Sequence, residues 1–170
     1  MNESTFKEFY NRTYKPLRSY ICRICKNPNE ADDIVQESYL RFLQRPLETN
    51  DPAQMKTTIY TIATRLNIDR WKRKKRIEKW QLRSSHIEHF EIEEDIGNRT
   101  DMMQVFAKLN SKERSLLWLA YVDGHSHRDI GKILRMKENS VRVLLFRARS
   151  KLAKILKNQN IGEELQYETK

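Results

Sequence analysis

The chain has 170 residues with only four glycines and four prolines, so it holds one ordinary domain or two small ones. Its many Leu, Ile, Lys, Arg and Glu residues favour helices over a sheet. A net charge of +10 predicts a polyanionic partner, with nucleic acid ahead of an anionic membrane. No apolar run is long enough to cross a bilayer and the polar start does not resemble a signal peptide, so we expect a cytoplasmic protein.

The charge is unevenly distributed along the chain. The net charge is +1 over residues 1–50, +6 over 51–80, −3 over 81–110 and +6 over 111–170. The acidic stretch 86–97 has no sustained apolar periodicity, which predicts a linker. We therefore expect an all-α protein of two small helical domains, 1–80 and 101–158, joined by a flexible linker over 81–100. A tail follows over 159–170.

Three helices are predicted in the first half. Residues 5–25 carry apolar side chains at helical spacing, and Pro16 is expected to kink or divide this run. Residues 30–44 place an apolar stripe on one side and a polar group on the other, formed by Asp32, Asp33, Gln36 and Glu37. After a polar loop over 45–54, residues 55–77 form the third helix, with Ile62 and Leu66 facing inward.

The third helix carries the first signal of nucleic-acid chemistry. Tyr60, Asn67, Trp71 and Lys74 follow one another at steps of seven, four and three, which predicts one exposed stripe. Aromatic rings can stack on unpaired bases while the cations of residues 72–76 hold phosphates. Alternatively, the rings cover a neighbouring helix and the basic run is a solvated helix end.

The second half contains the pattern of a helix-turn-helix. Helices over 101–109 and 111–122 are expected, with Thr100 or Ser111 as caps. Ser126 and Asp129 then resemble a capping box that starts a short helix, in which Gly131 allows close approach of the next helix. A tight turn over 135–138 leads into a longer amphipathic helix.

In such a unit the second helix enters the DNA major groove with its N-terminal residues near the base edges. Asn139, Ser140, Arg142 and Val143 occupy this position, whereas Arg147, Arg149 and Lys151 are better placed for phosphates. The alternative is an ordinary helical hairpin with a charged face.

Short motifs in the two halves occur in a distinctive order. Asp32 to Glu37 form an acidic pair followed by Ile-Val-Gln-Glu. Later come Asp129-Ile130-Gly131, Leu134, Ser140-Val141-Arg142, Arg147-Ala148-Arg149 and Leu152. Over nearly its whole length the chain resembles the extracytoplasmic-function class of bacterial sigma factors, the minimal two-domain type. It departs from the pattern of that class in the third helix, where Thr58 and Arg65 replace a Trp and an Asn.

The resemblance implies a division of labour. The polar group of residues 32–37 would bind core RNA polymerase, and the helix-turn-helix would read the minus-thirty-five promoter element. The minus-ten element would be captured by the third helix, for which we select Tyr60, Asn67, Asp69, Trp71, Lys72, Arg73 and Lys74. The resemblance further implies promoter DNA and an anti-sigma factor as partners, a monomer when bound to polymerase, and neither enzymatic activity nor a cofactor.

Two other interpretations explain part of the sequence. A helix-turn-helix regulator acting without polymerase explains residues 101–158 but not the first half, and a general single-strand or RNA-binding protein is a weaker rival. Cys22 and Cys25 together with His86 and His89 have the number of ligands for zinc. However, a Cys-x-x-Cys inside an amphipathic helix is more often a pair of small core residues, so we expect no metal.

Overall fold

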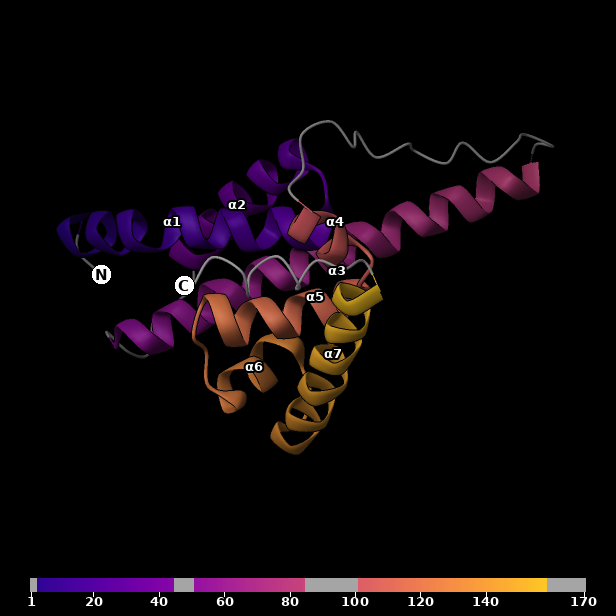
Figure 1. Cartoon of the computed structure of the whole chain (residues 1–170). Helices are drawn as coiled ribbons and strands as arrows, with labels where there is room; N and C mark the ends of the chain where they lie inside the picture. The colour runs from indigo at the N-terminus through magenta and orange to yellow at the C-terminus, as the bar shows by residue number, and fades with distance from the viewer. Residues whose placement is uncertain (1–2, 45–50, 85–100, 159–170) are drawn as a thin grey trace, which may run out of the picture.

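The computed structural model describes residues 3–44, 51–84 and 101–158, and these ranges contain helices and no strands. In chain order the elements are α1 (Glu3–Cys25), α2 (Pro28–Leu43), α3 (Pro52–Ser84), α4 (Asp101–Ala107), α5 (Ser111–Leu117), the short π-helix η1 (Trp118–Val122), α6 (His127–Leu134) and α7 (Glu138–Asn158). The predicted all-α class is confirmed. Figure 1 shows α3 running through the molecule, with its C-terminal part extending beyond the other helices.

The first half is a three-helix unit in which α1, α2 and α3 share an apolar core. Leu17, Ile34 and Ile59 are fully buried there, and the Tyr20 hydroxyl is 3.0 Å from the Thr64 hydroxyl. Pro16 was expected to kink or divide the run over 5–25, and division does not occur, because α1 continues through Pro16 as one helix. Pro16 lies on the exposed side of α1, where water can solvate the backbone carbonyl that its missing N–H leaves free.

The short link from α1 to α2 is fixed by backbone conformation and capping. Lys26 has a left-handed φ of 62°, which ends α1. The side chain of Asn27 then accepts a hydrogen bond from the Glu30 amide at 3.1 Å, and Pro28 follows in the first turn of α2. Both residue types are favoured at a helix start because they satisfy or remove an orphan N–H.

Capping also defines the helices of the second half. The cap of α5 is Asn110 and not the expected Ser111. The Asn110 side chain accepts from the Glu113 amide, and the Glu113 carboxylate accepts from the Asn110 amide, each at 2.9 Å. Thr100 lies outside the described residues. The predicted start of α6 is confirmed, because the Ser126 hydroxyl accepts from the Asp129 amide at 3.1 Å.

The turn of the helix-turn-helix requires a glycine in α6. The helix ends at Arg135 in a left-handed conformation, and the chain folds back directly against Gly131. A Cβ at Gly131 would lie 2.8 Å from the Met136 carbonyl oxygen. On the other side of the turn, α7 buries Val141, Leu145 and Ala148.

The two halves pack against each other, through α3 with α6 and through α1 with α5. The buried guanidinium of Arg114 donates to the backbone carbonyl of Ile24 at 3.2 Å, near the C-terminus of α1, where a cation is favoured. Lys56 Nζ donates to the Asp123 carbonyl at 2.8 Å, and the Arg23 guanidinium lies 5.5 Å from the Trp118 ring centroid. We call this packing the closed arrangement.

The expected division into domains 1–80 and 101–158 stays a prediction. In the structure, buried apolar residues of both halves form one continuous cluster. The expected linker 81–100 begins too early, since α3 continues to Ser84. Its remainder, 85–100, lies outside the described residues, as do the tail 159–170 and residues 45–50 of the polar loop.

Two titratable side chains lie at the contact of the halves with opposite pKa shifts. The His125 ring packs edge-on against Tyr60 with centroids 4.8 Å apart. Burial, assisted by the Lys56 ammonium, lowers the pKa of His125 to about 4, and nearby Asp129 opposes this. Burial raises the pKa of Asp123 to about 6, although Lys56 and the Tyr60 hydroxyl favour its ionised form.

We predict that Gly131→Ala destabilises the fold. The added methyl group meets a backbone carbonyl, which should lower the free energy of unfolding by about 1–3 kcal/mol and outweigh the roughly 1 kcal/mol by which Ala is the better helix former. Urea unfolding measures the change. Gly124→Asn is the control, because a Cβ added at Gly124 would have no atom within 4 Å and Asn tolerates the φ of 66° at this position. A midpoint for Gly131→Ala at or above that of the unaltered protein would contradict the prediction.

A second prediction concerns pH. The raised pKa of Asp123 contributes stability that is present below about pH 4 and is lost as the pH rises through 6. The lowered pKa of His125 contributes stability that is present above about pH 6.5 and is lost as the pH falls through 4. The two slopes oppose each other between pH 4 and 6. Relative to the unaltered protein, His125→Phe should therefore lose stability with rising pH, and Asp123→Asn should gain it. Urea midpoints across this range measure both slopes, and parallel curves for the three proteins would refute the assignment.

Candidate functional site

The polar face of α2 is held in place by arginines from both neighbouring helices. Arg18 of α1 donates to the Asp32 carboxylate with Nε–Oδ1 at 2.5 Å and Nη2–Oδ2 at 3.0 Å, and this hydrogen bonding lowers the pKa of Asp32. Asp33 and Gln36 are exposed. The expected group of residues 32–37 thus forms one continuous surface on α2.

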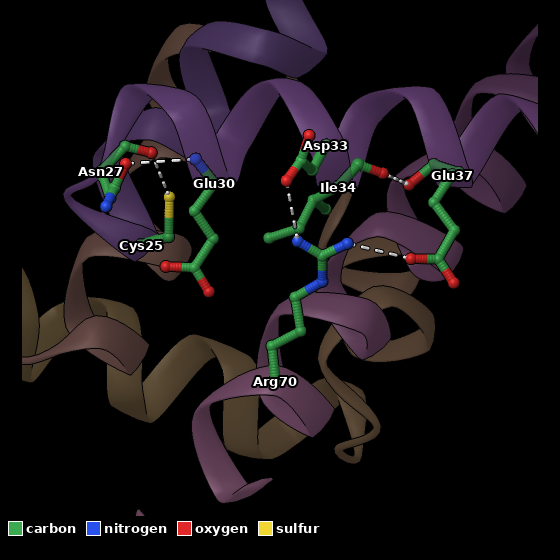
Figure 2. A network of polar contacts seen from close by, with 8 residues as sticks. Cys25, Asn27, Glu30, Asp33, Ile34, Glu37 and Arg70 are labelled. Atoms are coloured by element: carbon green, nitrogen blue, oxygen red, sulfur yellow. Dashed lines mark hydrogen bonds and ion pairs between the residues drawn. The ribbon is translucent and has the colours of Figure 1, made fainter. Parts of the chain in front are cut away.

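Arg70 of α3 joins two members of this face. Its guanidinium lies 3.0 Å from the Glu37 carboxylate and 3.8 Å from that of Asp33, as Figure 2 shows. Glu37 also forms the intrahelical pair with Arg41 at 2.5 Å. Partial burial opposes ionisation of Glu37, but the hydrogen bonds from Arg70 and Arg41 prevail and lower its pKa. Sequence reasoning missed Arg70, because only the fold brings residues 33 positions apart together.

The predicted stripe on α3 is only partly exposed, which corrects the sequence interpretation. Tyr60 is fully buried and Asn67 is 8% exposed, so the two do not form an open surface with Trp71 and Lys74. The physical reason is the closed arrangement, in which α6 packs on α3 and the His125 ring covers Tyr60. The alternative interpretation was that the two rings cover a neighbouring helix, and it applies to Tyr60 but not to the exposed Trp71.

The C-terminal part of α3 has the exposed basic character that was expected. Asp69, Trp71, Lys72, Arg73 and Lys74 are all exposed, with Trp71 at 54%. Lys75 Nζ lies 4.3 Å from the centroid of the Trp71 ring, a cation–π contact that the sequence pattern does not specify. A ring beside cations on a projecting helix suits contact with bases and phosphates (Figure 1).

The face of α7 opposite its buried residues is open. The predicted base-reading residues Asn139, Ser140, Arg142 and Val143 are exposed at the N-terminal end, and Arg142 lies 3.4 Å from the Glu138 carboxylate one turn away. Such an exposed pair is worth at most about 1 kcal/mol, so Arg142 is available to another partner. The helix therefore presents its side chains as a recognition helix does.

The cations intended for phosphates differ in their surroundings. Arg147 and Arg149 are exposed. Lys151 instead donates to both carboxylate oxygens of Glu113 on α5, at 2.8 and 3.1 Å. Partial burial opposes ionisation of Glu113, while its bonds to Lys151 and the Asn110 amide lower its pKa overall. Lys151 thus links α7 to α5 in this structure.

The cysteines show no arrangement for metal binding within the described ranges. Among these residues no cluster of three or more Cys, His, Asp or Glu side chains could hold an ion, and His86 and His89 lie outside them. Burial raises the pKa of Cys22, and it raises that of Cys25 to about 11. Within the same ranges, no helix combines the length and apolar character that a bilayer span requires.

Two family models match the chain in the order of its halves. Sigma-70 region 2 matches residues 9–77, which include α2 and most of α3, and sigma-70 region 4 matches residues 99–152, which include the helix-turn-helix. Together the two models cover most of the chain. Their order follows that of the two most basic parts of the sequence, residues 51–80 and 111–170.

Similar proteins agree with this match. The ECF RNA polymerase sigma factor SigX of Bacillus subtilis (strain 168) is 22% identical, and the match covers 98% of this chain and 92% of SigX. The ECF RNA polymerase sigma factor SigW of the same organism is 29% identical, and the match covers 85% of this chain and 86% of SigW. The structure of the sigma factor RpoE with the anti-sigma factor NepR from Bartonella quintana has a similar fold, with a TM-score of 0.64 at 20% identity, covering 89% of this chain and 96% of that one. The chain therefore belongs to the sigma-70 family, in its extracytoplasmic-function group.

Proposed function

We propose that this sigma factor divides promoter recognition between its two exposed helical surfaces, while the polar face of α2 binds core RNA polymerase. The observation that carries the proposal is the open face of α7, which presents Arg142 and Val143 at the N-terminal end of a recognition helix. Promoter-specific run-off transcription with core polymerase is the direct test. A regulator acting without polymerase would instead bind duplex DNA alone and fail to support transcription.

The α2 face suits core binding because its carboxylates are prearranged. Arg18 and Arg70 hold Asp32 and Glu37 from the flanking helices, so binding would not have to order these side chains. Asp33 is 69% exposed and is held less closely, at 3.8 Å from Arg70. It is therefore the member of the face most open to a basic surface on the polymerase.

The α3 surface is assigned to the minus-ten element. Trp71 can stack on an unpaired base, and Lys72, Arg73 and Lys74 can hold the phosphates of the melted strand. Tyr60 and Asn67 can join this surface only when α6 and the turn before it move away, because both are buried in the closed arrangement. We therefore infer that opening of the closed arrangement precedes full engagement of the minus-ten element.

The remaining partners follow by analogy. The similar solved structure contains RpoE with the anti-sigma factor NepR, and we propose an anti-sigma factor for this chain as well. We also propose that the protein acts in the cytoplasm as a monomer on polymerase and contributes recognition without catalysis of its own. The binding partners are then the core enzyme, promoter DNA and the inhibitor.

For core binding, we predict that Asp33→Arg weakens the affinity for core polymerase at least about tenfold, a cost of about 1.4 kcal/mol. A cation on the acidic face repels a basic partner and competes with Arg70 for Glu37. Fluorescence titration of labelled chain with core enzyme measures the affinity. Glu8→Arg is the matched control, because Glu8 is similarly exposed on α1 and undergoes the same change of charge. Equal affinities for the two variants would contradict the placement of the core-binding face.

For promoter recognition, we predict different losses from α7 and α3. In the holoenzyme, Arg142→Ala should cost about 1–3 kcal/mol on the preferred minus-thirty-five sequence and relax discrimination at one base pair. Arg73→Ala should weaken binding about equally across sequences and lower the salt slope by about 1. Binding to a promoter library at several salt concentrations separates these effects. The same loss of discrimination from both variants would refute the assignment.

A further inference from the structure

A cavity of about 500 Å³ lies at the contact of the two halves. The first half contributes the end of α1, Glu30 of α2 and one face of α3, and the second half contributes the start of α5 and the turn after α6. Cavities of this size at domain interfaces are where small ligands usually bind. Because both halves line it, the cavity exists only in the closed arrangement.

The α3 wall of the cavity presents a buried amide beside an aromatic ring. Three residues from successive turns of the helix line it: Asn67, Trp71 and Lys74. Thr64 and Ile68 of the same helix also line it. Asn67 is 8% exposed and lines the cavity. An amide has both donor and acceptor capacity, so a ligand with both kinds of group at one edge would satisfy it.

The charge on the cavity wall favours an anion. Its lining includes the cations Lys26, Lys74, Lys112 and Arg114, against the single carboxylate of Glu30. Arg114 is engaged with backbone carbonyls. Lys74 and Lys112 form no ion pair with the residues described, and they come from opposite halves.

We propose that this cavity binds a nucleoside phosphate that acts as an effector of the closed arrangement. The Asn67 amide would pair with the base edge, for which adenine offers the matching donor and acceptor. Trp71 would pack against the base, and Lys74 and Lys112 would hold the phosphates. The amide and the ring select a base, while the two lysines require that the ligand carry negative charge.

Such a ligand would oppose the function proposed above. It would stabilise the form in which Tyr60 and Asn67 are buried, and it would occupy Trp71 and Lys74 on the minus-ten surface. A ligand that binds one of two states shifts the equilibrium toward that state by mass action. Full engagement of the minus-ten element requires the open form, so ADP at about 100 times its dissociation constant should weaken it up to about 100-fold.

The binding test uses the full chain and ADP, with adenosine and pyrophosphate as separate probes. Isothermal titration should show one ADP site, with each partial probe binding at least about tenfold more weakly. Lys112→Gln should weaken ADP binding several-fold, whereas Lys154→Gln, the same change at an exposed lysine of α7 outside the cavity, should not. Absence of saturable ADP binding, or equal binding by the two variants, would overturn the proposal.

A base of single-stranded DNA offers the same chemical groups, but it would bind to the α3 surface alone. A short single-stranded oligonucleotide distinguishes the two, because Lys112 lies on the opposite half: Lys112→Gln should leave oligonucleotide binding unchanged while reducing ADP binding. An equal reduction of both would place ADP on a general nucleic-acid surface and overturn the proposal. The proposed role as a sigma factor is tested separately by run-off transcription and does not depend on this outcome.

Discussion

The structure depends on the burial of α3 from two sides. One side carries Ile59 and Leu66 into the core of the first half, and the side with Tyr60 and Asn67 lies under the second half. A helix buried on both sides cannot present either to DNA, so α3 is open only at its first residues, 52–54, and in the part beyond Asn67. The packing of α6 on α3 thus decides which residues of the predicted nucleic-acid surface are accessible.

The contact that covers α3 contains many polar groups. Arg114 and Lys56 each donate to a backbone carbonyl across it, and burial there lowers the pKa of His125 and raises that of Asp123. Water can satisfy each of these groups when the halves separate, so opening costs less than exposing an apolar interface of the same area. A contact of this kind suits the opening that the proposed function requires.

Local chemistry made part of this fold predictable. The Ser126 cap, the need for Gly131 and the inward face of α7 all depend on residues within a few positions of one another. Periodicity also identified the common face of Tyr60 and Asn67, but it could not show that α6 covers this face. Arg70 and Arg114 were missed for the same reason: a long cation has no sequence signal for a partner 33 or 90 positions away.

The two proposed nucleic-acid surfaces differ in access, and in the proposed function this difference orders the steps of promoter recognition. The exposed face of α7 is available while the halves are closed, whereas full engagement of α3 requires that they separate. In the closed form one cation that α7 was expected to offer to phosphates, Lys151, is held by Glu113. Each phosphate contact that is missing makes duplex binding weaker. In the proposed function, a partner that holds the halves apart supplies the energy for tight promoter binding. The carboxylates of α2, already held in position, would give this partner a docking surface that opening does not disturb.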